Sequence, residues 1–527
     1  MLKKIKKTFF KKENIPVILI LLAGGFFRLY RISEYLTFLG DEGRDVLVVK
    51  HILDGNLTLL GPTASVGGFF LGPIYYYMMA PFLLIFNFNP VGPAVMVALF
   101  GVLTIWLVYK VTNEFFGYYP ALISSLLYAI SPLVIIYSKS SWNPNTVPFF
   151  TLLMLFMLYV GFIKKSNKYF FLSGIVLGIL LQLHYLTTFL GVFCGVYILV
   201  CTIYGGSKKI LGSFMTVLKR YGLFLSGIII GWSPFLAFEV RHGFPNVQSI
   251  SEFVLTSGET GNNGQYFKIV SDVFLRLFGR LLLAFPRVED LRLYSPMVLD
   301  IWGFASYAIG FLSIIICIFG ITYSLKKKDT QFYKFSLLLL WLIVCVFLFG
   351  FYKKAIYDYY FGILFPLPFI LFGGLVSYAF ARGRIVTVIV LVGILGMIGL
   401  NLYNTPIFYP RNNQLKQVRS ISEFVLSKTD GKPFNFAVIS SGGNSDYAYR
   451  YFFEVNEKIP VTIEFPGADP KRDTITDQLL IVCESVPCQP LGYPLWEVAG
   501  FGQAEIVGEW PISVVKVYKL VHYKSEK

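Results

Sequence analysis

The sequence predicts a polytopic α-helical membrane protein with about 11 spanning helices, a large first external loop and a small C-terminal external α/β domain. Composition is the first observation: 55% of the 527 residues are hydrophobic and 14% are charged, whereas soluble proteins carry about 25% charged residues. The second is the pattern, because apolar runs of roughly 18–22 residues, long enough to cross a bilayer, fill most of the chain. The third is the last part of the chain, where mixed helix and strand patterns replace these runs.

Basic loops fix the direction of the spans, since lysine and arginine concentrate on the cytoplasmic side of a membrane. Six lysines among the first 12 residues place the N-terminus inside. The apolar run after them ends in Phe26-Phe27-Arg28 rather than in small residues, so we expect an uncleaved first helix. The net charge of +16 arises mostly from such loops, and no nucleic acid partner is expected. The predicted spans are 15–32, 91–110, 119–138, 146–163, 168–186, 188–204, 221–239, 302–325, 332–351, 359–380 and 384–403.

One apolar segment, residues 71–86, is predicted not to span. Strict alternation of the basic loops requires this, and the segment is short, carries Gly72-Pro73 near its start and contains Pro81. It is expected to lie in or dip into the outer interface, which makes residues 33–90 one large external loop. The alternative is a twelfth span.

An acidic pair, Asp41-Glu42, follows the first helix and is flanked by Arg44 and Asp45. Ionisable residues at a membrane face are costly and usually functional. One carboxylate could act as a general base while the other orients a substrate or binds a cation, and Arg44 would set the local charge. In the alternative interpretation, Asp41 is the N-cap of a short helix predicted over about 43–54.

Other external segments supply candidates for substrate contact. In the loop between the third and fourth helices, Lys139 could meet a phosphate, Trp142 is either an interface anchor or a substrate contact, and Asn145 is expected to cap the next helix. His184 ends the fifth helix as a packing residue or a ligand. External cations run against the positive-inside bias, so they need a reason, and binding a lipid phosphate is one. The remaining candidates are Asn143, Arg241, His242, Lys353, Lys354 and Tyr360, the last as a platform for a sugar or part of an aromatic belt.

The tail is predicted to be a separate external domain, residues 404–527, after a transmembrane domain of residues 1–403. Residues 414–426 have helical periodicity, and residues 434–439, 479–483 and 514–520 are short β-rich runs between turn signals. Cys483 and Cys488 lie five positions apart, so a local disulfide is possible if the tail is outside the cytoplasm. No nucleophile motif or phosphate loop is evident in this part.

The order of motifs over about residues 15–400 resembles that of the C-type membrane glycosyltransferases, which include the protein O-mannosyltransferases and the lipid A aminoarabinose transferases. The shared features are the acidic pair in a large first external loop and the proline-containing segment that follows it. Further similarity lies in Phe115-Phe116-Gly117, in the helix end from Ala129 to Ser138 and in the helix start from Tyr359 to Pro368.

The resemblance implies a polyprenyl-phosphate-linked sugar as donor and transfer to an unknown lipid, glycan or protein acceptor on the outer face of the membrane, with inversion at the anomeric carbon. It also implies that Asp41 is the catalytic base, that Glu42 is its partner and that external cations bind the donor phosphate. The chain departs from the family at Asn143 and Asn145, where some relatives carry an acidic residue. No cofactor is therefore predicted with certainty, and a divalent cation stays open.

The expected location is the cytoplasmic membrane, crossed many times, with the N-terminus in the cytoplasm and the tail outside. The rival interpretation is a polytopic transporter or lipid-linked sugar flippase, which would show charged or broken helices at the membrane midplane and an internal repeat. The predicted helices carry few such charges. A second rival is a receptor-like protein whose active part is the tail.

Overall fold

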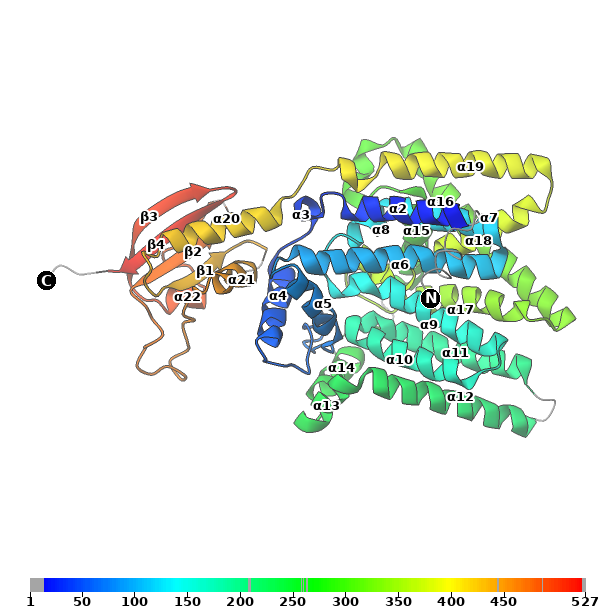
Figure 1. Cartoon of the computed structure of the whole chain (residues 1–527), viewed down its shortest axis with the longest axis horizontal. Coiled ribbons are helices and arrows are strands. Elements are labelled where there is room, and N and C mark those ends of the chain that lie inside the picture. Colours follow the sequence, from blue (N-terminus) through cyan, green and yellow to red (C-terminus); the bar gives the residue numbers. More distant parts are fainter. Residues whose placement is uncertain are drawn as a thin grey trace, which may run out of the picture. The chain divides into compact units, whose positions relative to one another are not determined.

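Twelve apolar helices dominate the part of the chain that the computed structural model describes, namely residues 14–206, 210–256, 258, 260–261, 264–442, 445–485 and 487–523. Seven of them are long and apolar enough to cross a membrane, and five are shorter. The long helices run roughly parallel to one another (Figure 1). The lysines of the N-terminus, Lys208, Lys209 and part of the segment 257–264 fall outside the described residues.

Eleven of these helices correspond one by one to the predicted spans, which confirms the predicted fold class. They are α2 (Ile15–Leu29), α6 (Val91–Phe116), α7 (Tyr118–Ile130), α9 (Val147–Ile163), α10 (Asn167–Leu183), α11 (Thr188–Gly205), α12 (Ile210–Gly231), α16 (Pro296–Lys327), α17 (Gln331–Phe349), α18 (Leu367–Phe380) and α19 (Arg384–Tyr403). The twelfth is α5 (Ile74–Ile85), the segment that was predicted not to span. Its 12 residues reach about 18 Å, well short of the roughly 30 Å hydrocarbon core of a bilayer.

Proline breaks the helix that was predicted as one span over 119–138. Helix α7 ends at Ile130, and α8 (Pro132–Tyr137) follows it. Pro132 has no N–H, so it cannot bond to the carbonyl of Tyr128 one turn earlier. The fully buried Arg28 replaces that donor: its guanidinium donates to the carbonyls of Tyr128, at 3.5 Å, and Ala129, at 3.0 Å. A buried cation of the first helix thus completes the C-terminal end of α7.

Further elements join these twelve helices. They are α3 (Ile32–Tyr35), α4 (Gly40–Leu53), η2 (Asn143–Thr146), η3 (Tyr185–Thr187), α13 (Ser233–His242), α14 (Pro245–Leu255), α15 (Tyr266–Leu283), η4 (Val288–Leu293), η5 (Asp358–Ile363) and η6 (Pro406–Phe408). Helix α15 was not predicted, because the segment 240–300 was interpreted only as an external region. Its last two turns are almost wholly buried.

The tail folds as predicted, around a four-stranded sheet in the order β1-β2-β4-β3. Strands β1 and β2 are parallel, whereas β4 pairs antiparallel with both β2 and β3. Cys483 and Cys488 form a disulfide. The predicted helix and three predicted strands are present, while β3, α21 and α22 were missed. The elements are α20 (Gln414–Ser427), β1 (Asn435–Ile439), α21 (Tyr447–Val455), β2 (Gln478–Cys483), α22 (Trp496–Ala499), β3 (Ala504–Ile512) and β4 (Val515–His522).

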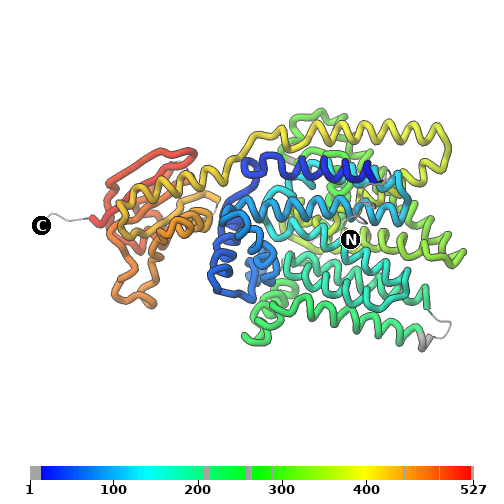
Figure 2. Tube along the Cα trace, in the orientation of Figure 1, coloured from blue at the N-terminus to red at the C-terminus, as the bar shows by residue number. Residues whose placement is uncertain are grey.

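The described chain divides into two compact units. The first, here called the membrane unit, contains the residues up to Tyr30 together with 58–78 and 95–410. The second, the tail unit, contains 31–57, 79–94 and 411–527. Figure 2 shows how the chain enters the tail unit early, in blue, and returns to it at the end, in orange and red. The helix that carries the acidic pair therefore belongs to the same unit as the C-terminal sheet, a grouping that the sequence did not predict.

Candidate active site

The acidic pair lies in the first turn of α4, in the tail unit. The helix begins at Gly40, three residues before the predicted start, so Asp41 is inside the helix and is not its N-cap. That prediction is wrong because Glu42 satisfies the helix end instead: the backbone N–H of Leu39 donates to Glu42 Oε2 at 3.1 Å. Two carboxylates at the N-terminus of a helix are also favoured by its dipole.

Arg44 joins two carboxylates of different exposure. Its Nη1 donates to Asp41 Oδ1 at 2.9 Å, and its Nη2 and Nε donate to Asp45 Oδ1 at 2.8 and 3.0 Å. The Asp45 side chain is fully buried, whereas that of Asp41 is 54% exposed. The buried partner anchors the guanidinium, and the guanidinium orients the exposed carboxylate. Asp41 is thus held in one direction and still accessible to a reactant.

Glu42 has a different environment from its neighbour. The residue is only 7% exposed. Burial raises the pKa of its carboxyl to about 7, and the nearby charges of Asp41 and Asp45 act in the same direction. Adjacent carboxylates whose environments differ in this way are suited to different roles.

The buried Glu42 predicts a specific dependence of stability on pH. Because its pKa is raised from 4.5 to about 7 in the folded protein, its protonated form is favoured by folding. Its contribution to the free energy of unfolding amounts to about 3 kcal/mol. This contribution is complete below pH 4.5 and is lost as the pH rises to about 7. We expect Glu42→Gln to escape this loss. The Tm of both proteins is measured between pH 4 and 8. The Tm of the variant should rise relative to that of the wild type as the pH increases from 4.5 to about 7. A difference in Tm that does not change with pH would contradict the assignment.

In the membrane unit, the segment after α8 carries four of the predicted residues, namely Lys139, Trp142, Asn143 and Asn145. Lys139 is buried, and burial, followed by the charge of Arg28, lowers the pKa of its amine to about 8. The amide of Asn143 donates to the carbonyl of Leu183 at 2.5 Å, which ties the loop to the end of α10. Asn145 was predicted to cap α9, and this prediction is wrong. The helix starts after Thr146, and the Asn145 amide donates to the carbonyl of Ser140 at 3.0 Å.

An aromatic cluster brings together Trp142, His184 and Tyr360, which were predicted separately. The rings of Trp142 and Tyr359 lie 4.3 Å apart, and the His184 ring lies 5.5 Å from that of Tyr360. His184 accepts the backbone N–H of Leu186 through Nδ1, and burial lowers its pKa to about 3, so it is a neutral packing group. We define the aromatic cluster as Trp142, His184, Tyr185, Tyr352, Tyr359 and Tyr360.

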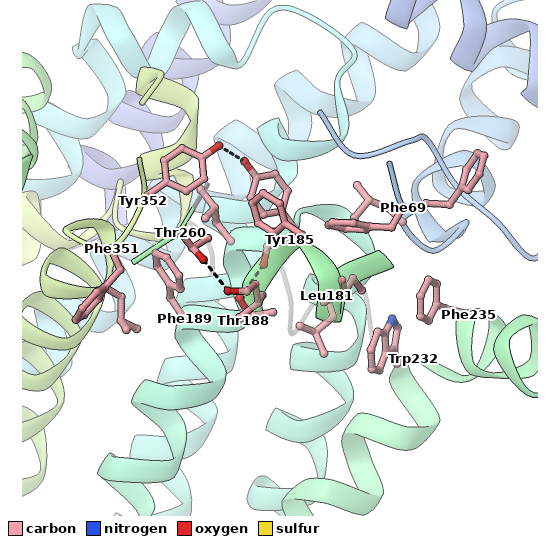
Figure 3. Close-up of a pocket in the computed structure, with 17 residues that line it drawn as sticks. Phe69, Leu181, Tyr185, Thr188, Phe189, Trp232, Phe235, Thr260, Phe351 and Tyr352 are labelled. Atoms are coloured by element: carbon pink, nitrogen blue, oxygen red, sulfur yellow. Dashed lines mark hydrogen bonds between the residues drawn. The ribbon is translucent and has the colours of Figure 1, made fainter. Parts of the chain in front are cut away.

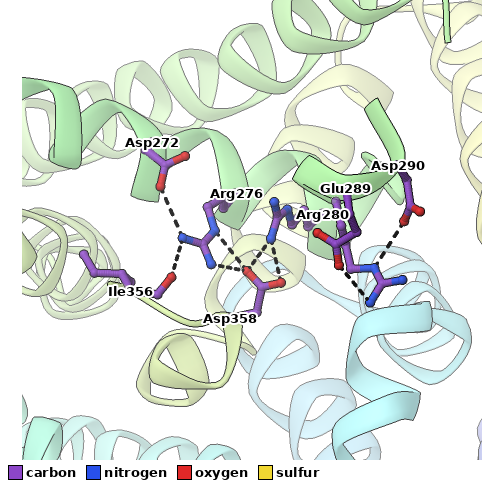
Figure 4. Close-up of polar contacts among 8 residues, drawn as sticks. Asp272, Arg276, Arg280, Glu289, Asp290, Ile356 and Asp358 are labelled. Atoms are coloured by element: carbon purple, nitrogen blue, oxygen red, sulfur yellow. Dashed lines mark hydrogen bonds and ion pairs between the residues drawn. The ribbon is translucent and has the colours of Figure 1, made fainter. Parts of the chain in front are cut away.

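An arginine pair, Arg276 and Arg280 of α15, lies beside this cluster and was missed by the sequence analysis. Both guanidinium groups bind one carboxylate, that of Asp358: Arg276 at 2.5 and 2.9 Å and Arg280 at 2.6 Å to each oxygen (Figure 4). Asp358 directly precedes Tyr359 and Tyr360 in the chain. Arg276 also donates to the carbonyl of Ile356 at 2.8 Å. Arg276 donates as well to the exposed Asp272, at 3.2 Å, so the two cations share the buried Asp358 carboxylate and one of them has a second anionic partner.

An apolar cavity of about 330 Å³ opens in the membrane unit, and the segment that leads to Asp358 supplies part of its lining. Tyr185 and Tyr352 line it, and their hydroxyls are hydrogen-bonded at 3.0 Å (Figure 3). Trp232 contributes an indole N–H for which the described residues offer no acceptor. The remaining lining is almost entirely aromatic and aliphatic, with Phe69, Phe70, Leu71, Leu181, Leu186, Thr188, Phe189, Phe235, Ile250, Phe253, Val254, Thr260, Leu348 and Phe351.

The other predicted cations stand apart from the arginine pair. Arg241 and His242 are exposed at the end of α13, where His242 is hydrogen-bonded to the carbonyl of Phe238 in its own helix. Lys353 and Lys354 are exposed in the loop that leads to Asp358. Among the described residues, no group of three or more His, Cys, Asp or Glu side chains is arranged to hold a metal ion.

Comparison with known proteins shows similarity to one family in sequence and to solved structures in fold. The model of the dolichyl-phosphate-mannose-protein mannosyltransferase family matches residues 71–232. No curated protein matches the chain significantly. The structure is similar to that of ArnT from Cupriavidus metallidurans bound to undecaprenyl phosphate, with a TM-score of 0.57 and 13% identity over 96% of this chain and 97% of that one.

A second similar structure is the apo form of the oligosaccharyltransferase from Archaeoglobus fulgidus, with a TM-score of 0.51 and 14% identity over 86% of this chain and 65% of that one. At these identities the structures show a common fold. The chain therefore resembles the C-type membrane glycosyltransferases, in fold over nearly all its length and in sequence over residues 71–232.

Proposed function

We propose that the protein transfers a sugar from a polyprenyl-phosphate donor to an acceptor on the outer face of the membrane, with inversion at the anomeric carbon. The observation that carries the proposal is the surroundings of the arginine pair. One loop of the membrane unit supplies Tyr352 to an apolar cavity and, six residues later, Asp358 to Arg276 and Arg280. A ligand with an apolar chain and an anionic head matches this combination.

The donor phosphate would take the place that the Asp358 carboxylate holds in the ligand-free protein. Guanidinium groups bind carboxylates and phosphates with the same bidentate geometry. Asp358 lies where a loop meets the first residue of η5, whereas both arginines lie on one face of α15, four residues apart. The loop can therefore yield while the cations stay. Tyr185 and Tyr352 would add hydroxyl donors beside the phosphate.

The apolar cavity would hold the first part of the polyprenyl chain. Its volume lies at the lower end of the range for ligand pockets, about 300–1,000 Å³, and its lining leaves few polar groups unsatisfied. The structurally similar ArnT was solved with undecaprenyl phosphate. This similarity supports a polyprenyl phosphate over a shorter phosphorylated ligand.

The reaction needs few protein groups beyond these contacts with the donor. The acceptor hydroxyl or amine attacks the anomeric carbon, the bond from that carbon to the phosphate oxygen breaks, and polyprenyl phosphate leaves with the bonding electrons. Asp41 would take the proton of the acceptor as general base. Its exposure and its fixed orientation by Arg44 fit this role. Glu42, with its raised pKa, would stay largely protonated below pH 7 and would support the helix end rather than compete for the proton.

The tail unit and the acceptor are proposed to be on the outer side. The basic loops predict this orientation, and the disulfide between Cys483 and Cys488 adds support, because disulfides persist in oxidising compartments. A lipid, a glycan or a protein would all satisfy the chemistry of the acceptor.

The proposal is tested with purified protein in liposomes and a panel of polyprenyl-phosphate sugars. Release of free polyprenyl phosphate is followed with and without a mixture of membrane lipids as acceptors. Release by the wild type that Asp41→Asn abolishes would support the proposal. If no donor is consumed and labelled donor instead crosses the bilayer, the protein is a flippase and the proposal fails.

Metal removal gives a further expected result. The carboxylates of Asp41 and Asp45 already share the guanidinium of Arg44, whose charge opposes a cation at the same place. We therefore expect turnover to be unchanged, within a factor of about 2, by excess EDTA, because the guanidinium supplies the charge that a metal would. Loss of turnover with EDTA, restored by Mg²⁺ or Mn²⁺, would contradict this expectation.

A further inference from the structure

Helix α4 has two different faces. Asp41 and Arg44 are three residues apart and so lie on one face, where they form their ion pair. Gly40, Gly43 and His51 lie within about 80° of one another around the helix axis, because they are separated by three and eight residues. Asp41 and Gly43 are about 200° apart around the helix axis. The reacting carboxylate and Gly43 thus point in nearly opposite directions, whereas Gly40 is about 100° from Asp41 around the axis.

The glycine face packs directly against the start of α21, within the tail unit. A Cβ atom at Gly43 would lie 2.4 Å from both the Cα and the backbone N of Ala448. A Cβ atom at Gly40 would lie 2.5 Å from Ser445 Oγ. Ordinary van der Waals contact begins at about 3.4 Å. The two backbones therefore approach as closely as they do only because both positions of α4 are glycine.

Further contacts fix α4 along its length and around its axis. At the far end of the helix, His51 Nε2 lies 2.9 Å from Glu454 Oε2 of α21. Just before the helix, the Phe38 ring packs against those of Tyr451 and Phe452, at 6.3 and 5.7 Å. The backbone N–H of Phe38 donates to the side chain of Gln414 at 3.1 Å. The C-terminal part of the chain thus holds both ends of the acidic helix.

We propose that the C-terminal domain positions the catalytic carboxylate, through the close packing of Gly40 and Gly43 on Ser445 and Ala448. The inference rests on the proposed role of Asp41 as base. Gly43 and Ala448 touch neither donor nor acceptor in this account, so they are positioning residues. They act by fixing the height and rotation of α4, and with these the direction of the Asp41 carboxylate.

The Gly43→Ala variant tests the inference with a single methyl group. Alanine is a better helix former than glycine, so any loss cannot be assigned to a weaker helix. The added methyl must move α4 about 1 Å away from α21 to reach ordinary contact, and a 1 Å misplacement can cost about 100-fold in rate. We expect kcat to fall about 100-fold with the KM for the donor unchanged. Gly467→Ala is the matched control, because that tail-unit glycine has open space around it and an unstrained backbone; it should have wild-type kcat.

A double-mutant cycle separates positioning from a general structural effect. If Gly43→Ala acts through Asp41, then adding it to Asp41→Asn should lower kcat by no more than a factor of about 3, because the carboxylate it displaces is already gone. If the two effects multiply, Gly43 acts on something else and the inference is wrong. Ala448→Leu, which enlarges the other side of the same contact, should repeat both results.

A disulfide tests the contact without reference to activity. The Cβ atoms of Gly40→Cys and Ser445→Cys would lie 2.8 Å apart before any adjustment, and a disulfide needs about 3.5–4.5 Å. We expect this pair to form a bond on oxidation. Gly40→Cys with Ser513→Cys, in the exposed turn between β3 and β4, is the control pair and should not bond.

The outcomes distinguish this inference from the proposed function. Failure of the Gly40/Ser445 pair to bond would overturn the positioning role whatever the reaction is. If the pair bonds and Asp41→Asn has full activity, the contact stands but Asp41 is not the base, so the proposed function fails and the inference fails with it.

Discussion

Replacing Asp41 with asparagine should lower kcat by about 10²–10⁴-fold, the range that a general base contributes, and should leave donor binding unchanged. The substitution keeps the size of the side chain and one acceptor oxygen for Arg44, but removes the negative charge that accepts a proton. Because Asp41 is 54% exposed, the protein loses no packing. The measurement is single-turnover release of polyprenyl phosphate, with donor binding measured in parallel by titration.

The same helix offers a matched control. Asp54 is also exposed and also pairs with a basic residue of α4, at 2.8 Å from Lys50. Exposed ion pairs of this kind contribute little to stability, about 0–1 kcal/mol. Asp54→Asn should therefore have wild-type turnover. Equal losses at positions 41 and 54 would mean that the charge of the helix matters and that Asp41 is not a base.

Removal of the arginine pair should abolish use of the donor. Hydrogen bonds to charged groups contribute about 1.5–3 kcal/mol each, so Arg276→Met should raise the KM for the donor about 10- to 100-fold, and Arg276→Met with Arg280→Met should leave no measurable release. The control is Arg287→Met: this arginine is 56% exposed and pairs with Glu289 and Asp290, which Figure 4 labels near the arginine pair. It should have a wild-type KM.

A purely structural role for the pair is distinguished by removing both partners. Arg276→Met leaves Asp358 with less compensation in a buried position, which can destabilise the protein by itself. Arg276→Met with Arg280→Met and Asp358→Asn removes all three charges together, so no buried ion is left without its partner and the protein should fold well. If its KM for the donor returns to the wild-type value, the ion pair is structural. If the KM stays high, the guanidinium binds the donor.

Most of the membrane unit could be predicted because one physical requirement dominates it. A segment that crosses a bilayer must be apolar over its whole length and must satisfy its backbone internally, and both conditions are visible in a single sequence. The predicted span 302–325, for example, lies within α16, Pro296–Lys327. In the tail, the continuous apolar runs of β1 and β2 were found for the same reason, since both strands are completely buried.

The missed elements follow less regular rules. Strand β3 contains Gly508 and Pro511 and is mostly exposed, so it has the composition of a turn. The arginine pair was missed because Asp358 is about 80 residues away in sequence, and nothing in the local pattern shows that the chain returns there. A signal did exist: Asp272, Arg276 and Arg280 are spaced by four, which places three charges on one face of an otherwise apolar helix.

The acidic helix is an early segment whose packing partners are synthesised late. Phe38 and His51 contact residues 376 and 403 positions further along the chain. At about 5–20 residues per second, a ribosome needs roughly 20–80 s to make that stretch. During this interval, while helix after helix is inserted into the membrane, the glycine face of α4 has nothing to pack against. A chain that stops before α21 would thus contain every spanning helix and still lack the partners of the acidic helix, so that competence would arrive only once the residues up to Glu454 have been translated.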